Sequence, residues 1–229
     1  MRTLLSSFAA ISILVASIAY TDTFKLDLDL QQNGITNKAA EADEWLAKGN
    51  TAYNAKDYDE AIKCYKQATV LDPSFASAYY NLGIIYSAKG LLDEAISAYK
   101  KVLTIKPDYY VARNNLGSAY MKKGMLDEAI SELKGVLASK PDFPHAHFNL
   151  GECYFTKGDN TLAADYYYKA GILFVGRGDK EWTKKSYDSL KKTNAEKLEK
   201  SLFEKMNAEE NQKKGFLEES IEIKPKKVD

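Results

Sequence analysis

The feature that most constrains this chain is a set of residues that recur every 34 positions. One series of glycines falls at residues 49, 83, 117 and 151, and a series of alanines falls at residues 61, 95, 129 and 163. A second glycine series begins at Gly90, and three of the five prolines share one phase that begins at Pro73. Chance does not align several residue types at one period, so the spacing predicts a structural repeat of 34 residues.

Each repeat is predicted to contain two helices. In residues 76–109 the first helix is expected from about Ser77 to Lys89, and it ends at Gly90, a residue that tolerates positive φ. The second helix is expected to start near Leu92 and to end before Pro107. The small residues at 83 and 95 are expected where the two helices cross, because a larger side chain would hold their axes apart.

The repeat resembles the tetratricopeptide repeat (TPR), whose pattern is W-x2-L-G-x2-Y, then A-x3-F, then P. The second unit shows it as Tyr79-x2-Leu82-Gly83-x2-Tyr86, followed by Ala95-x3-Tyr99 and Pro107. The resemblance covers four units, at residues 42–75, 76–109, 110–143 and 144–175. It implies an all-α fold, a right-handed α-solenoid of helix-turn-helix units.

After the fourth unit the register changes. Ala170-Gly171-x2-Phe174 and Tyr187 resemble a further unit displaced by 20 residues, so a helix from about Asn160 to Val175 is expected to serve both the fourth unit and this degenerate fifth. Residues 176–210 are predicted to form the degenerate fifth unit, with a helix from Lys180 to Lys192, and a capping helix. The charged residues 211–229 are predicted to be a disordered tail.

The N-terminal residues 1–19 have the composition of a signal peptide, with Ser17-Ile18-Ala19 as a small-x-small cleavage site. The alternative is an uncleaved membrane anchor at residues 4–20, which has the minimum length of a spanning helix. Residues 20–41 are predicted to be a polar linker. The sequence thus favours an extracytoplasmic location, periplasmic or secreted, and it predicts membrane contact only if the N-terminal segment is retained.

Charge and residue inventory exclude several function classes. The 32 basic and 32 acidic residues balance, so the basic excess that nucleic acids attract is missing. Cys64 and Cys153 lie in different repeats, while His145 and His147 point to different sides of one helix, so we expect no disulfide and no metal site. No catalytic motif is supported, and we therefore predict no enzyme activity and no cofactor.

In TPR proteins a concave groove lined by the first helix of each unit usually holds a peptide. Carried over to this chain, the resemblance implies a groove lined by Leu46, Asn50, Tyr53, Tyr80, Asn81, Ile84, Asn114, Asn115, Met121, Phe148, Asn149, Glu152 and Phe155.

The polar lining of this groove distinguishes two kinds of ligand. TPR cochaperones that clasp a terminal carboxylate use two Asn and three basic residues; Asn50 and Asn81 match the amides, but the bases are missing, so this interpretation is rejected. Asn81, Asn115 and Asn149 instead occupy one position in three units, as in TPR superhelices whose asparagines hold a peptide backbone. An Asn is also a frequent residue at that position, so the series has an ordinary explanation as well.

The leading hypothesis is a non-catalytic protein interaction module that binds a partly apolar peptide segment of a partner protein and assembles an extracytoplasmic complex. One alternative is an accessory subunit of an envelope enzyme or secretion machine that docks through its convex face. Another is a self-assembling scaffold. The sequence does not name the partner.

Overall fold

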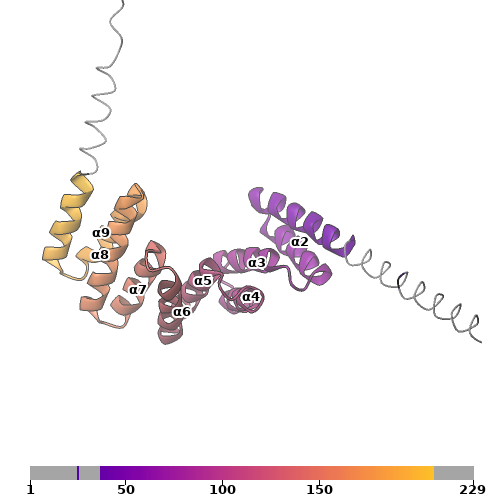
Figure 1. Cartoon of the computed structure of the whole chain (residues 1–229), viewed down its shortest axis with the longest axis horizontal. Helices are drawn as coiled ribbons and strands as arrows, with labels where there is room; N and C mark the ends of the chain where they lie inside the picture. Colours follow the sequence, from indigo (N-terminus) through magenta and orange to yellow (C-terminus); the bar gives the residue numbers. More distant parts are fainter. Residues whose placement is uncertain (1–24, 26–36, 209–229) are drawn as a thin grey trace, which may run out of the picture. The chain divides into compact units, whose positions relative to one another are not determined.

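The computed structural model describes residue 25 and residues 37–208, and the described part consists of helices joined by short turns (Figure 1). The predicted signal peptide at 1–19 and tail at 211–229 lie outside the described residues, as does most of the predicted linker at 20–41. The chain divides into two compact units, residues 1–81 and residues 82–229, which we call unit 1 and unit 2.

Unit 1 contains a helix at residues 37–54, then α2 (Tyr58–Leu71) and the start of α3 (Ala76–Ala88). The remaining helices belong to unit 2. They are α4 (Leu92–Ile105), α5 (Tyr110–Lys122), α6 (Leu126–Ser139), α7 (Pro144–Thr156), α8 (Asn160–Gly176), α9 (Lys180–Lys191) and a helix at residues 196–208. The helix bounds expected within 76–109 agree with α3 and α4 to within one or two residues. Within the described residues, none of the helices is both long and apolar enough to cross a membrane.

The first helix is described from residue 37, although residues 37–41 were predicted to belong to the linker. Ala39, Ala40 and Glu41 favour helix intrinsically, and Ala42 is only 1% exposed, so packing of the first helix extends to its N-terminal end. The absence of a clear apolar period in 20–40 concealed this extension from the sequence analysis.

The turn between the two helices of a repeat requires a left-handed backbone. Gly90, Gly124 and Gly158 have φ of +75°, +82° and +84°, and a Cβ on any of them would meet nothing within 4 Å. The glycine is therefore required by the backbone conformation and not by lack of space. In the first repeat Lys56 takes this position with φ of 63°, so that turn carries a strained non-glycine residue.

A second glycine series is required by close packing. A Cβ on Gly83 would lie 2.5 Å from Cε1 of Tyr99, and one on Gly117 would lie 2.8 Å from Cγ of Leu133. The corresponding contacts are Gly49 with Tyr65 at 2.5 Å and Gly151 with Tyr167 at 2.6 Å. The glycine lets the ring or leucine of the second helix lie directly on the first helix, as the crossing predicted at residue 83 requires.

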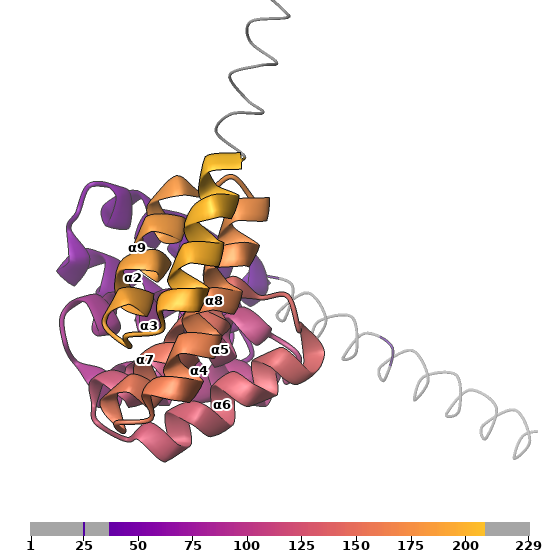
Figure 2. The ribbon, with the colours of Figure 1, turned by 90° about the vertical axis from the view of Figure 1, so that its left-hand side faces the viewer.

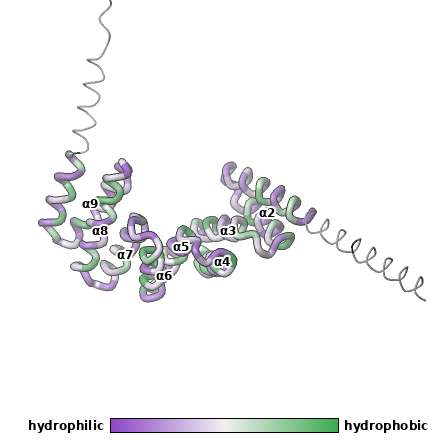
Figure 3. Tube along the Cα trace, in the orientation of Figure 1, coloured by the Kyte–Doolittle hydropathy of each residue, from purple (hydrophilic) through white to green (hydrophobic). Residues whose placement is uncertain are grey.

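In unit 2 each helix from α4 to α9 packs against the next, and α5 also contacts α7. Hydrophobic and hydrophilic residues are mixed along the helices (Figure 3). Buried residues lie on each of the helices that contact one another, so the core runs between successive helices and not at one central point. This is the arrangement of an α-solenoid.

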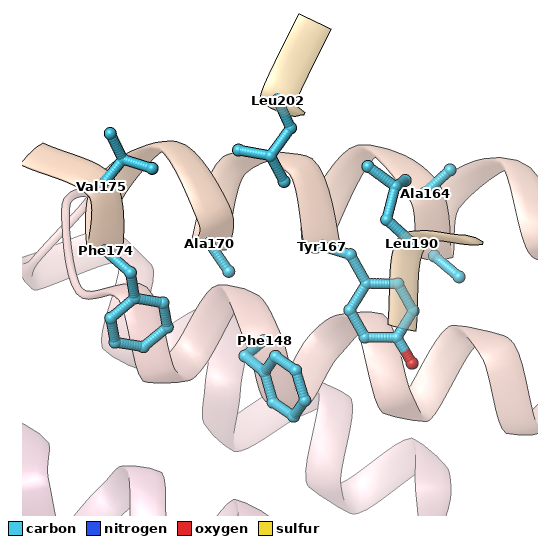
Figure 4. Close-up of a cluster of buried hydrophobic side chains, with 9 residues drawn as sticks. Phe148, Ala164, Tyr167, Ala170, Phe174, Val175, Leu190 and Leu202 are labelled. Atoms are coloured by element: carbon cyan, nitrogen blue, oxygen red, sulfur yellow. The ribbon is translucent and has the colours of Figure 1, made fainter. Parts of the chain in front are cut away.

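The C-terminal end departs from the regular repeat. The helix at residues 196–208 lies beside α8 and α9 (Figures 1 and 2), and its Leu202 is fully buried. Figure 4 shows Leu202 approaching α8 from the side opposite to the rings of Phe174 and Tyr167. A Cβ on Gly171 would lie 2.6 Å from Cδ2 of Leu202. The glycine of the degenerate fifth unit therefore makes room for Leu202 of the capping helix.

Candidate functional site

The residues expected to line a groove lie on first helices of the repeats, and they divide between the two units. Five belong to unit 1, on the helix at residues 37–54 and on α3: Leu46, Asn50, Tyr53, Tyr80 and Asn81. Of these, Asn50 and Tyr53 are exposed and the other three are half-buried. The remaining eight belong to unit 2 and lie on α3, α5 and α7.

In unit 1 the candidate amides are joined to one another. The Tyr65 hydroxyl donates a hydrogen bond to Oδ1 of Asn50 at 2.8 Å, and Nδ2 of Asn81 donates to the same oxygen at 3.1 Å. Asn50 therefore uses its carbonyl oxygen internally. Its amide nitrogen has no hydrogen bond to another described residue, so the exposed half of this side chain is a donor.

In unit 2 the candidate residues of α5 and α7 form what we call the α5–α7 face: Asn114, Asn115, Met121, Asn149, Glu152 and Phe155. Nδ2 of Asn149 donates to Oδ1 of Asn114 at 3.2 Å and so connects the two helices. Nδ2 of Asn114 in turn donates to Oδ1 of Asn115 at 3.4 Å. Asn114 is only 7% exposed, whereas the other five residues and Ile84 of α3 are half-buried.

Phe148 is not part of this face, although the sequence analysis placed it in the groove. Its side chain is 3% exposed and belongs to the core cluster of unit 2 (Figure 4). The ring centroid of Trp182 on α9 lies 5.3 Å away, and that of Tyr167 lies 5.5 Å away. The expectation failed because α9, which lacks the regular repeat pattern, covers a position that a further open repeat would have left accessible. A peptide cannot contact Phe148 without displacing α9.

Glu152 on the α5–α7 face makes two hydrogen bonds with side chains of α8 and α9. Its Oε1 accepts a hydrogen bond from the Tyr167 hydroxyl at 2.8 Å and another from Oγ of Ser189 on α9 at 3.3 Å. Burial raises the pKa of the Tyr167 hydroxyl far above its usual range, and the hydrogen bond to Glu152 and its charge add to this effect. Tyr167 is therefore a permanent donor, and it holds the carboxylate in one orientation.

Helix α9 contributes side chains around Phe148 and Glu152 that were not predicted from the sequence. Nζ of Lys185 lies 4.1 Å from the ring centroid of Trp182 and 4.9 Å from that of Phe148. Trp182, Lys185 and Ser189 are spaced three and four residues apart, and this helical spacing was the available signal for a shared face toward α7.

The two histidines do not converge on a common ligand. His145 packs against the rings of Phe174 and Trp182 at 5.0 and 4.8 Å, whereas His147 donates through Nε2 to the Pro141 carbonyl at 2.7 Å. Within residues 37–208 no group of three His, Cys, Asp or Glu side chains could hold a metal ion.

Both cysteines are buried thiols. Burial raises the pKa of the Cys153 thiol to about 11, and it also raises the pKa of Cys64. Neither side chain is a thiolate at neutral pH, so neither has the character of a reactive nucleophile.

The helix pairs can now be compared with known families. Three sequence models of tetratricopeptide repeats match the chain, at residues 49–90, 88–147 and 144–170. Together they span residues 49–170, which is more than half of the chain. The matches indicate no enzyme family.

Curated proteins match a short stretch of the chain. Protein bimA of Emericella nidulans is 46% identical over 44 residues, which are 19% of this chain and 6% of that protein. The chain spans less than a tenth of the length of the curated relatives it matches.

Solved structures extend the likeness to most of the described chain. The crystal structure of MamA protein covers 82% of this chain and 98% of its own, with a TM-score of 0.62 and 22% identity. The first TPR of Spaghetti (RPAP3), solved with the HSP90 peptide SRMEEVD, covers 52% of this chain and 95% of its own, with a TM-score of 0.51 and 24% identity. These likenesses confirm the predicted all-α solenoid. The three matching repeat models show that the chain belongs to the tetratricopeptide repeat family.

Proposed function

We propose that this protein interaction module binds an extended segment of a partner protein on the α5–α7 face, and that it does so without catalysis. The likeness to a TPR structure solved with a bound peptide supports peptide binding as the mode of interaction. The observation that carries the proposal is the pairing of Asn114 and Asn149 across α5 and α7. This pair holds polar groups on the same two helices that carry the half-buried apolar side chains of Met121 and Phe155.

The Asn149 amide is suited to a peptide backbone. Its nitrogen donates to Asn114, while its oxygen has no hydrogen bond to a described residue and the side chain is half-buried. The oxygen is thus available to accept a backbone N–H, which every residue except proline offers regardless of side chain. Half-buried apolar neighbours would exclude water from such a bond and supply most of the affinity.

Binding should be tested with an array of extended peptides and the full chain. Asn149→Ala removes the acceptor and is expected to weaken unrelated peptides alike, by roughly five- to tenfold for one lost hydrogen bond. Leu162→Ala is the matched control, because Leu162 is 38% exposed and lies on α8, which contributes no residue to the α5–α7 face. Unchanged binding by Asn149→Ala, with a loss in Leu162→Ala, would place the site on the second helices and contradict the proposal.

We further propose that the complex assembles outside the cytoplasm, on the basis of the signal-like residues 1–19 alone. N-terminal sequencing of the native protein is the direct test. A chain that begins at Tyr20 supports export with cleavage, whereas one that begins at Met1 contradicts it.

A further inference from the structure

The carboxylate of Glu152 is held in place but not neutralised. Its Oε1 receives both internal hydrogen bonds, from Tyr167 and Ser189. Oε2 has no hydrogen bond to a described residue, and in residues 37–208 no Lys or Arg nitrogen lies within 4.0 Å of this carboxylate. Oε2 is not fully buried, so it is accessible to a ligand.

Glu152 is exceptional at its place in the repeat. The equivalent residues 34, 68 and 102 positions earlier are Ser118, Ile84 and Asn50, none of which is charged. Within the α5–α7 face it is the single charged side chain, and the others are three amides, a methionine and a phenylalanine. One repeat therefore presents a negative charge where the remaining repeats present none.

The surroundings of Glu152 favour a cation that arrives from a partner. On α9, Lys185 lies one helical turn before Ser189, and its Nζ is engaged over the rings of Trp182 and Phe148. Phe155, one turn further along α7, is half-buried and packs partly against the core of unit 2. Glu152 thus lies between aromatic side chains, which limit screening by water of any charge pair formed there.

We propose that Glu152 selects a lysine or arginine in the bound segment, flanked by apolar residues. This inference rests on the proposed function and specifies its ligand. Two neutral donors already orient the carboxylate, so an ion pair at Oε2 requires little further ordering of the protein side. Asn149, three residues earlier on α7, contacts the peptide backbone, and Glu152 discriminates the side chain.

The test uses the full chain and one extended peptide that binds in the array, synthesised with Lys, Gln or Glu at each position in turn. At one position the Lys peptide is expected to bind roughly five- to tenfold more tightly than the Gln peptide, and the Glu peptide is expected to bind most weakly. Glu152→Gln should abolish this preference, because its amide oxygen still accepts from Tyr167 and Ser189 but carries no charge. Glu128→Gln, which removes an exposed carboxylate on α6, should keep it.

The thermal midpoint of each variant establishes that it is folded. Ser189→Ala is a second variant that retains the charge and removes one of the two hydrogen bonds, so the preference for Lys should shrink without vanishing. A preference that survives in Glu152→Gln, or that is absent in the wild type although peptides bind, overturns this inference and leaves the proposed function intact. Binding that is insensitive to Asn149→Ala as well overturns the proposed function itself.

Discussion

The first and fourth repeats, one in each unit, build the same local arrangement from different polar groups. In both, a tyrosine of the second helix lies against a glycine of the first, as Tyr65 does with Gly49 and Tyr167 with Gly151. In both, its hydroxyl donates at 2.8 Å to a residue 15 positions earlier. The acceptor is the exposed amide of Asn50 in the first repeat and the half-buried carboxylate of Glu152 in the fourth.

A second difference separates these repeats at the first residue of the TPR pattern. Trp45 occupies that position in the first repeat, with Nζ of Lys48 4.6 Å from its ring centroid, whereas the fourth repeat has the buried His147. The residues that pack the two helices together are thus the same in both repeats, whereas the polar residues beside them differ. Both histidines of the chain, His145 and His147, lie in the fourth repeat, so histidine-linked pH sensitivity is expected there.

The largest expected effect comes from truncating Phe148, which is buried in the fourth repeat, whereas its equivalent in the first repeat is half-buried. Phe148→Ala should lower the free energy of unfolding by about 3–5 kcal/mol, because it opens a cavity beneath α9. Leu46→Ala, the equivalent change in the first repeat, should cost less because Leu46 is half-buried. Denaturant unfolding, followed by Trp182 fluorescence in a Trp45→Phe background, measures the loss; an equal cost for both variants would contradict the burial described for Phe148.

The glycine contacts give the next largest effect. Gly151→Ala places a methyl group 2.6 Å from Cδ1 of the buried Tyr167, and overpacking of this kind typically costs about 1–3 kcal/mol. Gly176→Ala is the control, since a Cβ there meets nothing within 4 Å. Thermal unfolding should separate the two, and comparable midpoints would show that the helix crossing is not as close as described.

Acidification should destabilise the fourth repeat selectively. Burial lowers the pKa of His145; the charges of Arg177 and Lys185 lower it further, and the charge of Asp179 raises it. Burial also lowers the pKa of His147; the charge of Lys169 lowers it further, and the hydrogen bond to the Pro141 carbonyl raises it. The unfolded chain therefore binds more protons below its ordinary histidine pKa of about 6.5. The free energy of unfolding has its full value above that pH. As the pH falls below it, the free energy of unfolding decreases by up to about 1.4 kcal/mol per pH unit for each imidazole, until the folded-state pKa is reached.

The check is the unfolding free energy between pH 7.5 and 5.5, above the range where most carboxylates titrate. His145→Val and His147→Tyr introduce the residues that repeats three and two have at these positions, Val111 and Tyr79. The double variant should lose the pH slope whatever its absolute stability. A slope that persists in it would assign the pH dependence to other groups.

The smallest expected effect on stability comes from removing the hydroxyl group of Tyr167 or of Tyr65. Tyr167→Phe should cost about 1 kcal/mol, because the half-buried Glu152 loses its shorter hydrogen bond. Tyr65→Phe should cost less, since the exposed Asn50 can bond to water and still receives the Asn81 amide. Paired chemical denaturation curves measure both, and a larger loss for Tyr65→Phe would reverse the comparison.

The structural features that repeat every 34 residues could be predicted from the sequence. Glycine at residues 83 and 90 has two distinct physical roles, one close contact and one left-handed turn, and both follow from spacing and residue type. The helix pairs and the likeness to TPR proteins followed from the same residues.

Contacts with the segments that follow the regular repeats could not be predicted from the sequence. The burial of Phe148 results from α9, and the partner of Gly171 is Leu202, 31 residues later; neither contact has a counterpart in the regular units. The asparagine series was visible, but side-chain pairing between Asn114 and Asn149 depends on the separation of α5 and α7, which no local pattern encodes.

The most direct test of the account is photo-crosslinking of an array-selected peptide to the full chain. Met121 on α5 is half-buried on the α5–α7 face and Leu162 on α8 is exposed, so p-benzoylphenylalanine is introduced at each position in turn. If the peptide binds on the α5–α7 face, a crosslink forms from position 121 and is competed by unlabelled peptide, and none forms from position 162. A competed crosslink from position 162 with none from position 121 would contradict binding on the α5–α7 face.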